Sequence, residues 1–97
     1  MAVGTKQKLL SSSEAAAFCG QMYMILKSGI SAMEGVSILL EDSQNEAERK
    51  ILEVMNEEIT RDGLLTPALR KAGVFPEYLI HMTELGEDTG TLDEVMN

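Results

Sequence analysis

The chain has 97 residues, of which only 4% are aromatic and seven are methionine. Such a chain forms one small domain whose core must be aliphatic and methionine-rich. Sixteen acidic residues against eight Lys and Arg give a formal net charge of -8. This charge argues against binding to nucleic acid or anionic lipid, and it fits a basic partner, a cation or simple solubility.

The single cysteine, Cys19, cannot form an intramolecular disulfide, which fits a reducing compartment. The N-terminal residues contain no apolar signal-peptide segment, and the longest apolar run, residues 15–26, is too short to span a bilayer. We therefore expect a soluble chain. The sequence stops inside a helical pattern, so the parent protein need not be soluble.

The first predicted helix follows a tether over residues 1–10. Ser11 and Glu14 form a Ser-x-x-Glu capping box, which is typical of a helix N-terminus. Apolar residues then recur at helical spacing, which predicts a helix over residues 13–28. Gly29 is suited to end it in a left-handed conformation.

Ser31 and Glu34 repeat the capping box and predict a second helix over residues 32–42, with Gly35 at a close helix crossing. Its inward residues are expected to be Met33, Val36, Leu39 and Leu40. Asn45 predicts the start of a third helix, 46–62. Its apolar face is expected to be Ala47, Ile51, Val54, Met55 and Ile59, with Gly63 after the last turn.

Three shorter helices complete the pattern. Thr66 as a cap and Pro67 in the first turn predict a helix over 67–72. The fifth helix is expected over 76–86, with Leu79, Met82 and Leu85 facing inward and Tyr78 beside them. Thr91 and Glu94 form the last capping box, and the sixth helix is cut off at Asn97.

The predicted fold is therefore all-α, a compact antiparallel bundle of six helices with short corners and a truncated sixth helix. The domain covers residues 11–97. Short connections of this kind place sequence neighbours side by side or at steep corners.

No residue set in the sequence predicts catalysis. His81 has no nucleophile in a recognisable motif, and its expected neighbours are Glu77 and Glu84, so it is interpreted as a structural or surface histidine. Cys19 lies on an apolar face without a cation nearby and is interpreted as a packing residue. No cofactor is predicted.

The segment "GEDTG", residues 86–90, admits two interpretations. Its acids would repel a phosphate, whereas Gly90 can supply a positive φ and Gly86 allows close helix approach, as expected of a corner between helices. Glu87 would then hold the start of the sixth helix. A weak Ca²⁺ site is the alternative, with candidate ligands Glu84, Glu87, Asp88, Asp93 and Glu94.

Three segments carry a family resemblance. They are "FCGQMYMILKSGISAMEGVSIL", then "DGLLTPAL" followed by "VFPEYL", and finally "GEDTGTLDEVM". Together they resemble the cytoplasmic domain of the type II secretion system F proteins, the inner-membrane platform proteins of type II secretion and type IV pilus assembly. The resemblance covers about Leu10 to Asn97. Its structural motif residues are Phe18, Gln21, Gly29, Gly63, Pro76, Gly86, Glu87, Gly90 and Leu92.

The resemblance implies a six-helix domain that occurs twice in a membrane-embedded protein, and Lys6 and Lys8 before the first helix favour the first copy. It also implies a non-enzymatic scaffold at the cytoplasmic face of the bacterial inner membrane. Such a scaffold docks the assembly ATPase, the pilin or pseudopilin, and other inner-membrane components.

After Lys71 the sequence has no Lys or Arg. We therefore expect the acids Glu84, Asp88 and Glu94 to contact a basic surface of the ATPase or of a second copy. A homodimer is also favoured by the apolar groove that a short sixth helix would leave along the first and fifth helices.

A free-standing acidic carrier or regulatory protein is the alternative. An acyl carrier would need an exposed Ser preceded by Asp at a helix start, but Ser31 follows Ile30. A hydrolase using His81 and a serine lacks any supporting motif.

Overall fold

Every regular element in the computed structural model, which describes residues 9–97, is an α-helix. The six helices are α1 (Ser12–Lys27), α2 (Ala32–Asp42), α3 (Glu46–Asp62), α4 (Leu65–Ala72), α5 (Glu77–Thr89) and α6 (Leu92–Met96). The prediction of an all-α domain with six helices is confirmed. Most of the predicted tether lies outside the described residues, although the Leu10 N–H donates to the Val74 carbonyl at 2.8 Å.

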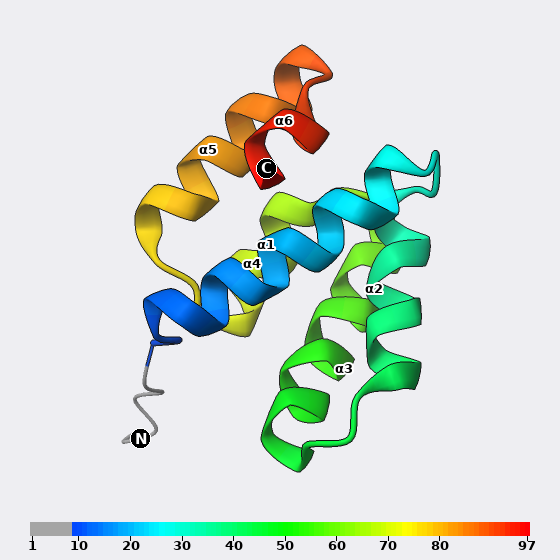
Figure 1. Ribbon diagram of the computed structural model, residues 1–97, viewed down its shortest axis with the longest axis vertical. Helices are drawn as coiled ribbons and strands as arrows, with labels where there is room; N and C mark the ends of the chain where they lie inside the picture. The colour runs from blue at the N-terminus through cyan, green and yellow to red at the C-terminus, as the bar shows by residue number, and fades with distance from the viewer. Residues whose placement is uncertain (1–8) are drawn as a thin grey trace.

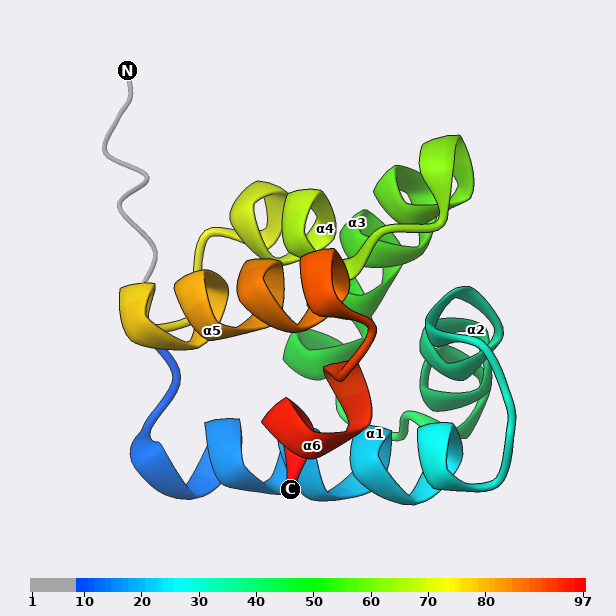
Figure 2. The same cartoon turned by 90° about the horizontal axis from the view of Figure 1, so that it is seen from above.

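The helices follow a closed path, because each packs against the next in sequence and α6 packs back against α1. α2 and α3 form an antiparallel pair (Figure 1). Figure 2 shows α6 lying between α5 and α1, so the C-terminal helix closes the path. The position of α5 relative to α4 and α6 therefore determines whether this path can close.

Local capping fixes the first three helix starts where the sequence predicts them. The Ser11 hydroxyl accepts the Glu14 N–H at 3.1 Å, and the Glu14 carboxylate accepts the Ser11 N–H at 2.8 Å. The side chains of Ser31 and Asn45 each accept the N–H of the residue three positions later. These bonds satisfy N–H groups that have no partner inside the helix.

The core is aliphatic and methionine-rich, as the composition predicts. Met22, Met55 and Met96 are fully buried together with aliphatic side chains from α2, α3 and α4. The rings of Phe18 and Phe75 pack at a centroid distance of 5.1 Å and link α1 to the α4–α5 loop. Few aromatic residues are needed because the flexible methionines fill irregular spaces.

Several inward-facing predictions are wrong. The side chains of Met33, Ala47, Val54, Met82, Leu85 and Tyr78 are exposed. Residues that the periodicity did not select, Leu52 on α3 and Ile80 and Thr83 on α5, are buried instead. α3 and α5 each carry apolar residues on more than one face. The spacing of these residues alone therefore does not identify the face that packs against the core.

The bounds of α4 and α5 also differ from prediction. α4 begins at Leu65, so Thr66 is its second residue and its N-cap, Leu64, makes no side-chain capping bond. α5 starts after Pro76 and continues to Thr89, three residues beyond the predicted end. Thr91 likewise makes no side-chain capping bond at the start of α6, so the predicted Thr91–Glu94 box does not form.

Gly86 marks the closest helix approach. A Cβ on Gly86 would lie 2.7 Å from Val95 Cγ2 and 3.2 Å from Leu92 Cα, both on α6. At the predicted crossing, a Cβ on Gly35 would lie 3.0 Å from Ile25 Cγ2. Gly20, also inside a helix, has no atom within 4 Å of the same position. Close packing therefore requires glycine at position 86, whereas the space around position 20 would accept a larger side chain.

We predict that Gly86→Ala lowers the free energy of unfolding by about 1–2 kcal/mol, because overpacking exceeds the gain in helix propensity. Gly20→Ala should raise it by roughly 0.5–1 kcal/mol, because only the propensity gain applies there. Urea denaturation of both variants measures the difference. Equal effects would contradict the close α5–α6 packing.

Candidate functional site

The "GEDTG" segment forms the last turn of α5 and its termination. Gly86 to Thr89 are helical, and Gly90 ends the helix with φ 73°. The Thr91 N–H then donates to the Gly86 carbonyl at 2.8 Å, which turns the chain directly into α6. The predicted corner is therefore present, with most of the segment inside the helix.

Glu87 binds the start of α4, which lies far from it in sequence. Its carboxylate accepts the N–H groups of Leu65 at 2.5 Å and Thr66 at 3.0 Å, and the Thr66 hydroxyl at 2.6 Å. Both N–H groups lie in the first turn of a helix, where no intrahelical acceptor exists and negative charge is favoured. Glu87 thus replaces the capping side chain that Leu64 cannot provide.

This contact corrects the expected role of Glu87. We expected Glu87 to hold the start of the sixth helix, but its bonds go to α4. No local pattern places Glu87 beside Leu65, because the two residues are 22 positions apart. The one available signal is the absence of a capping residue at Leu64, which indicates that another part of the chain supplies the acceptor.

The remaining acids near this corner lie at the surface. Glu84 pairs with Arg70 at 3.4 Å, and both side chains are about half exposed. Asp88 and Glu94 are exposed and form no ion pair within residues 9–97. We call Glu84, Asp88 and Glu94 the acidic surface.

The candidate calcium ligands do not come together. Among residues 9–97, no group of three or more His, Cys, Asp or Glu side chains is placed to hold a metal ion. Glu87 already accepts three hydrogen bonds from α4, and Asp93 is half-buried on α6. The geometry lends no support to a Ca²⁺ site at this corner.

His81 and Cys19 have ordinary surroundings. His81 is exposed, and its Nε2 lies 3.2 Å from a Glu77 carboxylate oxygen, so the expected Glu77 neighbour is present. Cys19 is half-buried against the core, and burial raises the pKa of its thiol. A raised pKa leaves less thiolate at neutral pH, which fits a packing role.

The other residues of the family motif lie in two places. Phe18 is buried in the core, whereas Gln21 is exposed on the same helix beside it. The remainder are at helix ends and corners: Gly29, Gly63 and Gly90 with positive φ, Pro76 as the N-cap of α5, and Leu92 against Gly86. Most of the motif therefore determines how the helices turn.

Three apolar residues of α5 that were predicted to face the core or lie beside it are at the surface. Tyr78, Met82 and Leu85 recur at helical spacing and are each about half exposed or more. They were expected to pack inward or beside the core. In the described part of the chain they instead form an open strip along α5, next to the strip that carries Glu84 and Asp88.

The fold and these surfaces define a small all-helical domain with apolar and acidic strips exposed on its helices. A sequence model of the family described as type II secretion system (T2SS), protein F matches residues 18–97. The chain belongs to this family. It is also 27% identical over 89 residues to the type II secretion system protein F of Pseudomonas aeruginosa, and it spans about a fifth (22%) of that protein's length.

Within residues 9–97, no helix has the length and apolar character that crossing a membrane requires.

We predict that Glu87→Ala lowers the free energy of unfolding by about 2–3 kcal/mol, because it leaves charge-assisted hydrogen-bond donors on α4 without an acceptor. Glu87→Gln should cost about 1 kcal/mol, since one acceptor oxygen remains. Asp88→Ala, at the adjacent exposed position, should stay within about 0.5 kcal/mol of the parent. Urea denaturation of the three variants measures these values, and a neutral Glu87→Ala would show that α4 needs no such cap.

Proposed function

We propose that this chain is a non-enzymatic docking domain of an inner-membrane platform protein in type II secretion or type IV pilus assembly, at the cytoplasmic face of the membrane. Membership of the protein F family over residues 18–97 carries the proposal. The contacts of Glu87 are consistent with this proposal, because its carboxylate accepts hydrogen bonds from the start of α4 and so has a structural role.

The acidic surface is the part that we assign to docking. Asp88 and Glu94 face solvent, and within residues 9–97 Glu84 is paired only with the half-exposed Arg70. Exposed carboxylates of this kind attract a basic partner and orient it during encounter, and they contribute modestly to final affinity. The partner proposed here is the assembly ATPase of the same machine, with the pilin or pseudopilin and other inner-membrane components as further contacts.

A second copy of the domain is the competing occupant of this region. The open row of Tyr78, Met82 and Leu85 lies next to the acidic surface, and such rows often pack against an identical row in a dimer. Sedimentation of the chain alone distinguishes a dimer from a monomer that binds the ATPase.

The carrier hypothesis has less support. Ser31, the candidate attachment residue, uses its hydroxyl to cap α2 by accepting the Glu34 N–H at 3.2 Å. An acidic regulatory protein is compatible with the surface charge, but family membership favours the platform role.

The test is charge reversal of the acidic surface. We predict that the triple variant Glu84→Lys, Asp88→Lys, Glu94→Lys weakens binding to the ATPase at least about tenfold, because exposed pairs worth roughly 0.5–1 kcal/mol each become repulsive. Affinity is measured by titration calorimetry at two salt concentrations, and the loss should be smaller at high salt.

The chain offers a matched control on α2 and α3. Glu41 is exposed on α2, as Glu84 is on α5, and it lines neither of the two hollows described below. Glu57 is exposed within a helix, as Asp88 is, and Glu46 lies in the first turn of a helix, as Glu94 does. Reversing these three gives the same net charge on another surface. If both triple variants lose the same affinity for the ATPase, the loss is due to net charge alone. That result would overturn the assignment of the acidic surface to docking.

A further inference from the structure

An apolar row on α3 lies open between two hollows. Ala47, Ile51 and Val54 recur at helical spacing; Ala47 and Val54 are exposed, and Ile51 is half-buried. The sequence pattern predicts that these residues face the core together with Met55 and Ile59. Met55 and Ile59 are buried as predicted, but Leu52 completes the buried face in place of Ala47, Ile51 and Val54. An apolar row at this spacing is typical of a helix that packs against another element. Within residues 9–97 no element covers it.

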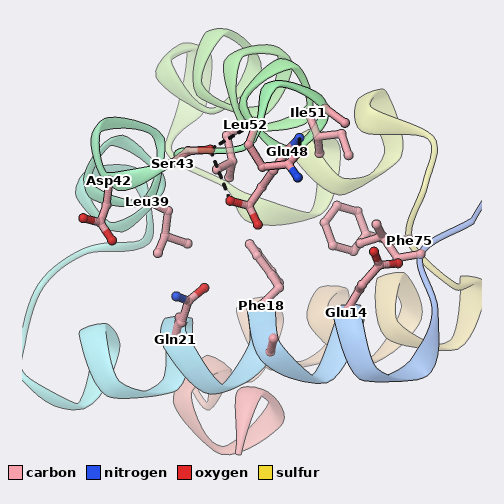
Figure 3. Close-up of a pocket in the computed structure, with 14 residues that line it drawn as sticks. Glu14, Phe18, Gln21, Leu39, Asp42, Ser43, Glu48, Ile51, Leu52 and Phe75 are labelled. Atoms are coloured by element: carbon pink, nitrogen blue, oxygen red, sulfur yellow. Dashed lines mark hydrogen bonds between the residues drawn. The ribbon is translucent and has the colours of Figure 1, made fainter.

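The first hollow lies between α1, the end of α2 and the start of α3, and has a volume of about 330 Å³. Its floor is apolar: Phe18 extends from α1 into the middle, with Leu39, Leu52 and Phe75 around it (Figure 3). Ala47 and Ile51 form part of its wall.

The second hollow lies on the other side of the same row. It has a volume of about 520 Å³ and is lined by Ile51 and Val54 on α3, by Ala72 at the end of α4, and by Val74 in the loop that follows. Ala47 and Ile51 line both hollows, so the two are continuous across α3. We call the row and its two hollows the α3 groove.

Charge along the groove is asymmetric. The first hollow is edged by Glu14, Asp42 and Glu48, and among residues 9–97 no Lys or Arg lines it. Glu48 accepts the Ser43 hydroxyl at 3.1 Å, and Glu14 accepts the Ser11 N–H, so two of the three carboxylates are held in place. The second hollow has one charge of each sign, Lys50 and Glu53.

We propose that the α3 groove docks an amphipathic helix of a protein partner, which places apolar side chains along Ala47, Ile51 and Val54 and Lys or Arg beside the first hollow. The row extends about 10 Å at 1.5 Å per residue, which matches the apolar face of about two helical turns. Two of the three acids, Asp42 and Glu48, lie beside the start of α3, at the Ala47 end of the row. The basic flank therefore belongs at one end of the bound helix, which fixes its direction. This surface is separate from the acidic surface, and the proposal does not depend on the ATPase assignment.

The probe is a fluorescently labelled amphipathic peptide of roughly four turns with leucines at i, i+4 and i+7 and lysines at one end. Its control is the same peptide with glutamate in place of lysine. Fluorescence anisotropy with the full chain should give saturable binding of the basic peptide and at least tenfold weaker binding of the acidic one. Amide chemical shifts should change mainly around Ala47, Ile51, Val54 and the first hollow.

Two substitutions separate groove binding from attraction by net charge. Ala47→Lys places bulk and positive charge in the groove and should weaken peptide binding at least tenfold. Thr60→Lys makes the same charge change at an exposed position on the same helix, outside the groove, and should change affinity less than twofold. Both positions are exposed, so neither variant depends on the core for folding.

A third variant tests the acidic edge. Glu14→Gln, Asp42→Asn and Glu48→Gln preserve shape, and Gln at position 14 retains the capping box. This triple variant should bind the basic peptide about three- to tenfold more weakly, with a flatter salt dependence.

Equal losses in Ala47→Lys and Thr60→Lys would overturn the proposal, as would shift changes centred on α5 instead of α3. Reversal of the acidic surface should leave peptide binding within twofold, so failure here and failure of the proposed function are distinguishable.

Discussion

The Glu87 carboxylate is the contact on which the arrangement of the second half of the domain depends. It lies in the last turn of α5 and satisfies two N–H groups at the start of α4. This interaction, with the Arg70–Glu84 ion pair and the buried side chains of both helices, positions α5 on α4. Gly86, one residue earlier, lets α6 pack tightly against α5. α6 then reaches α1, and the path of helices closes. The adjacent residues Gly86 and Glu87 thus each hold a different helix.

Local chemistry made much of the fold predictable. The caps at Ser11, Ser31 and Asn45 act within four residues, and the helices that they start have the predicted bounds to within one residue. The start of α4 was not predictable in this way, because its capping group lies 22 residues away. The sequence pattern also could not predict which faces of α3 and α5 point inward, because this depends on where the neighbouring helices lie. Glu84, Asp88 and Glu94 were predicted as surface acids from the charge asymmetry alone.

The residues that were wrongly predicted to face inward mark the exposed apolar faces of α3 and α5. Residues that look like core from their spacing but remain exposed, such as Val54 on α3 and Met82 on α5, lie on the two helix faces left open within residues 9–97. One face adjoins an acidic strip, and the other joins two hollows with an acidic edge.

The most direct test of this account is amide hydrogen exchange at Leu65 and Thr66 in the unmodified chain, followed by NMR. These N–H groups have no acceptor within α4, so in a helix without an external cap they exchange rapidly. If the Glu87 carboxylate holds them, both should exchange slowly, with protection close to that of the buried core of α3. Rapid exchange at both positions, in a chain whose core remains protected, would contradict the central role of Glu87.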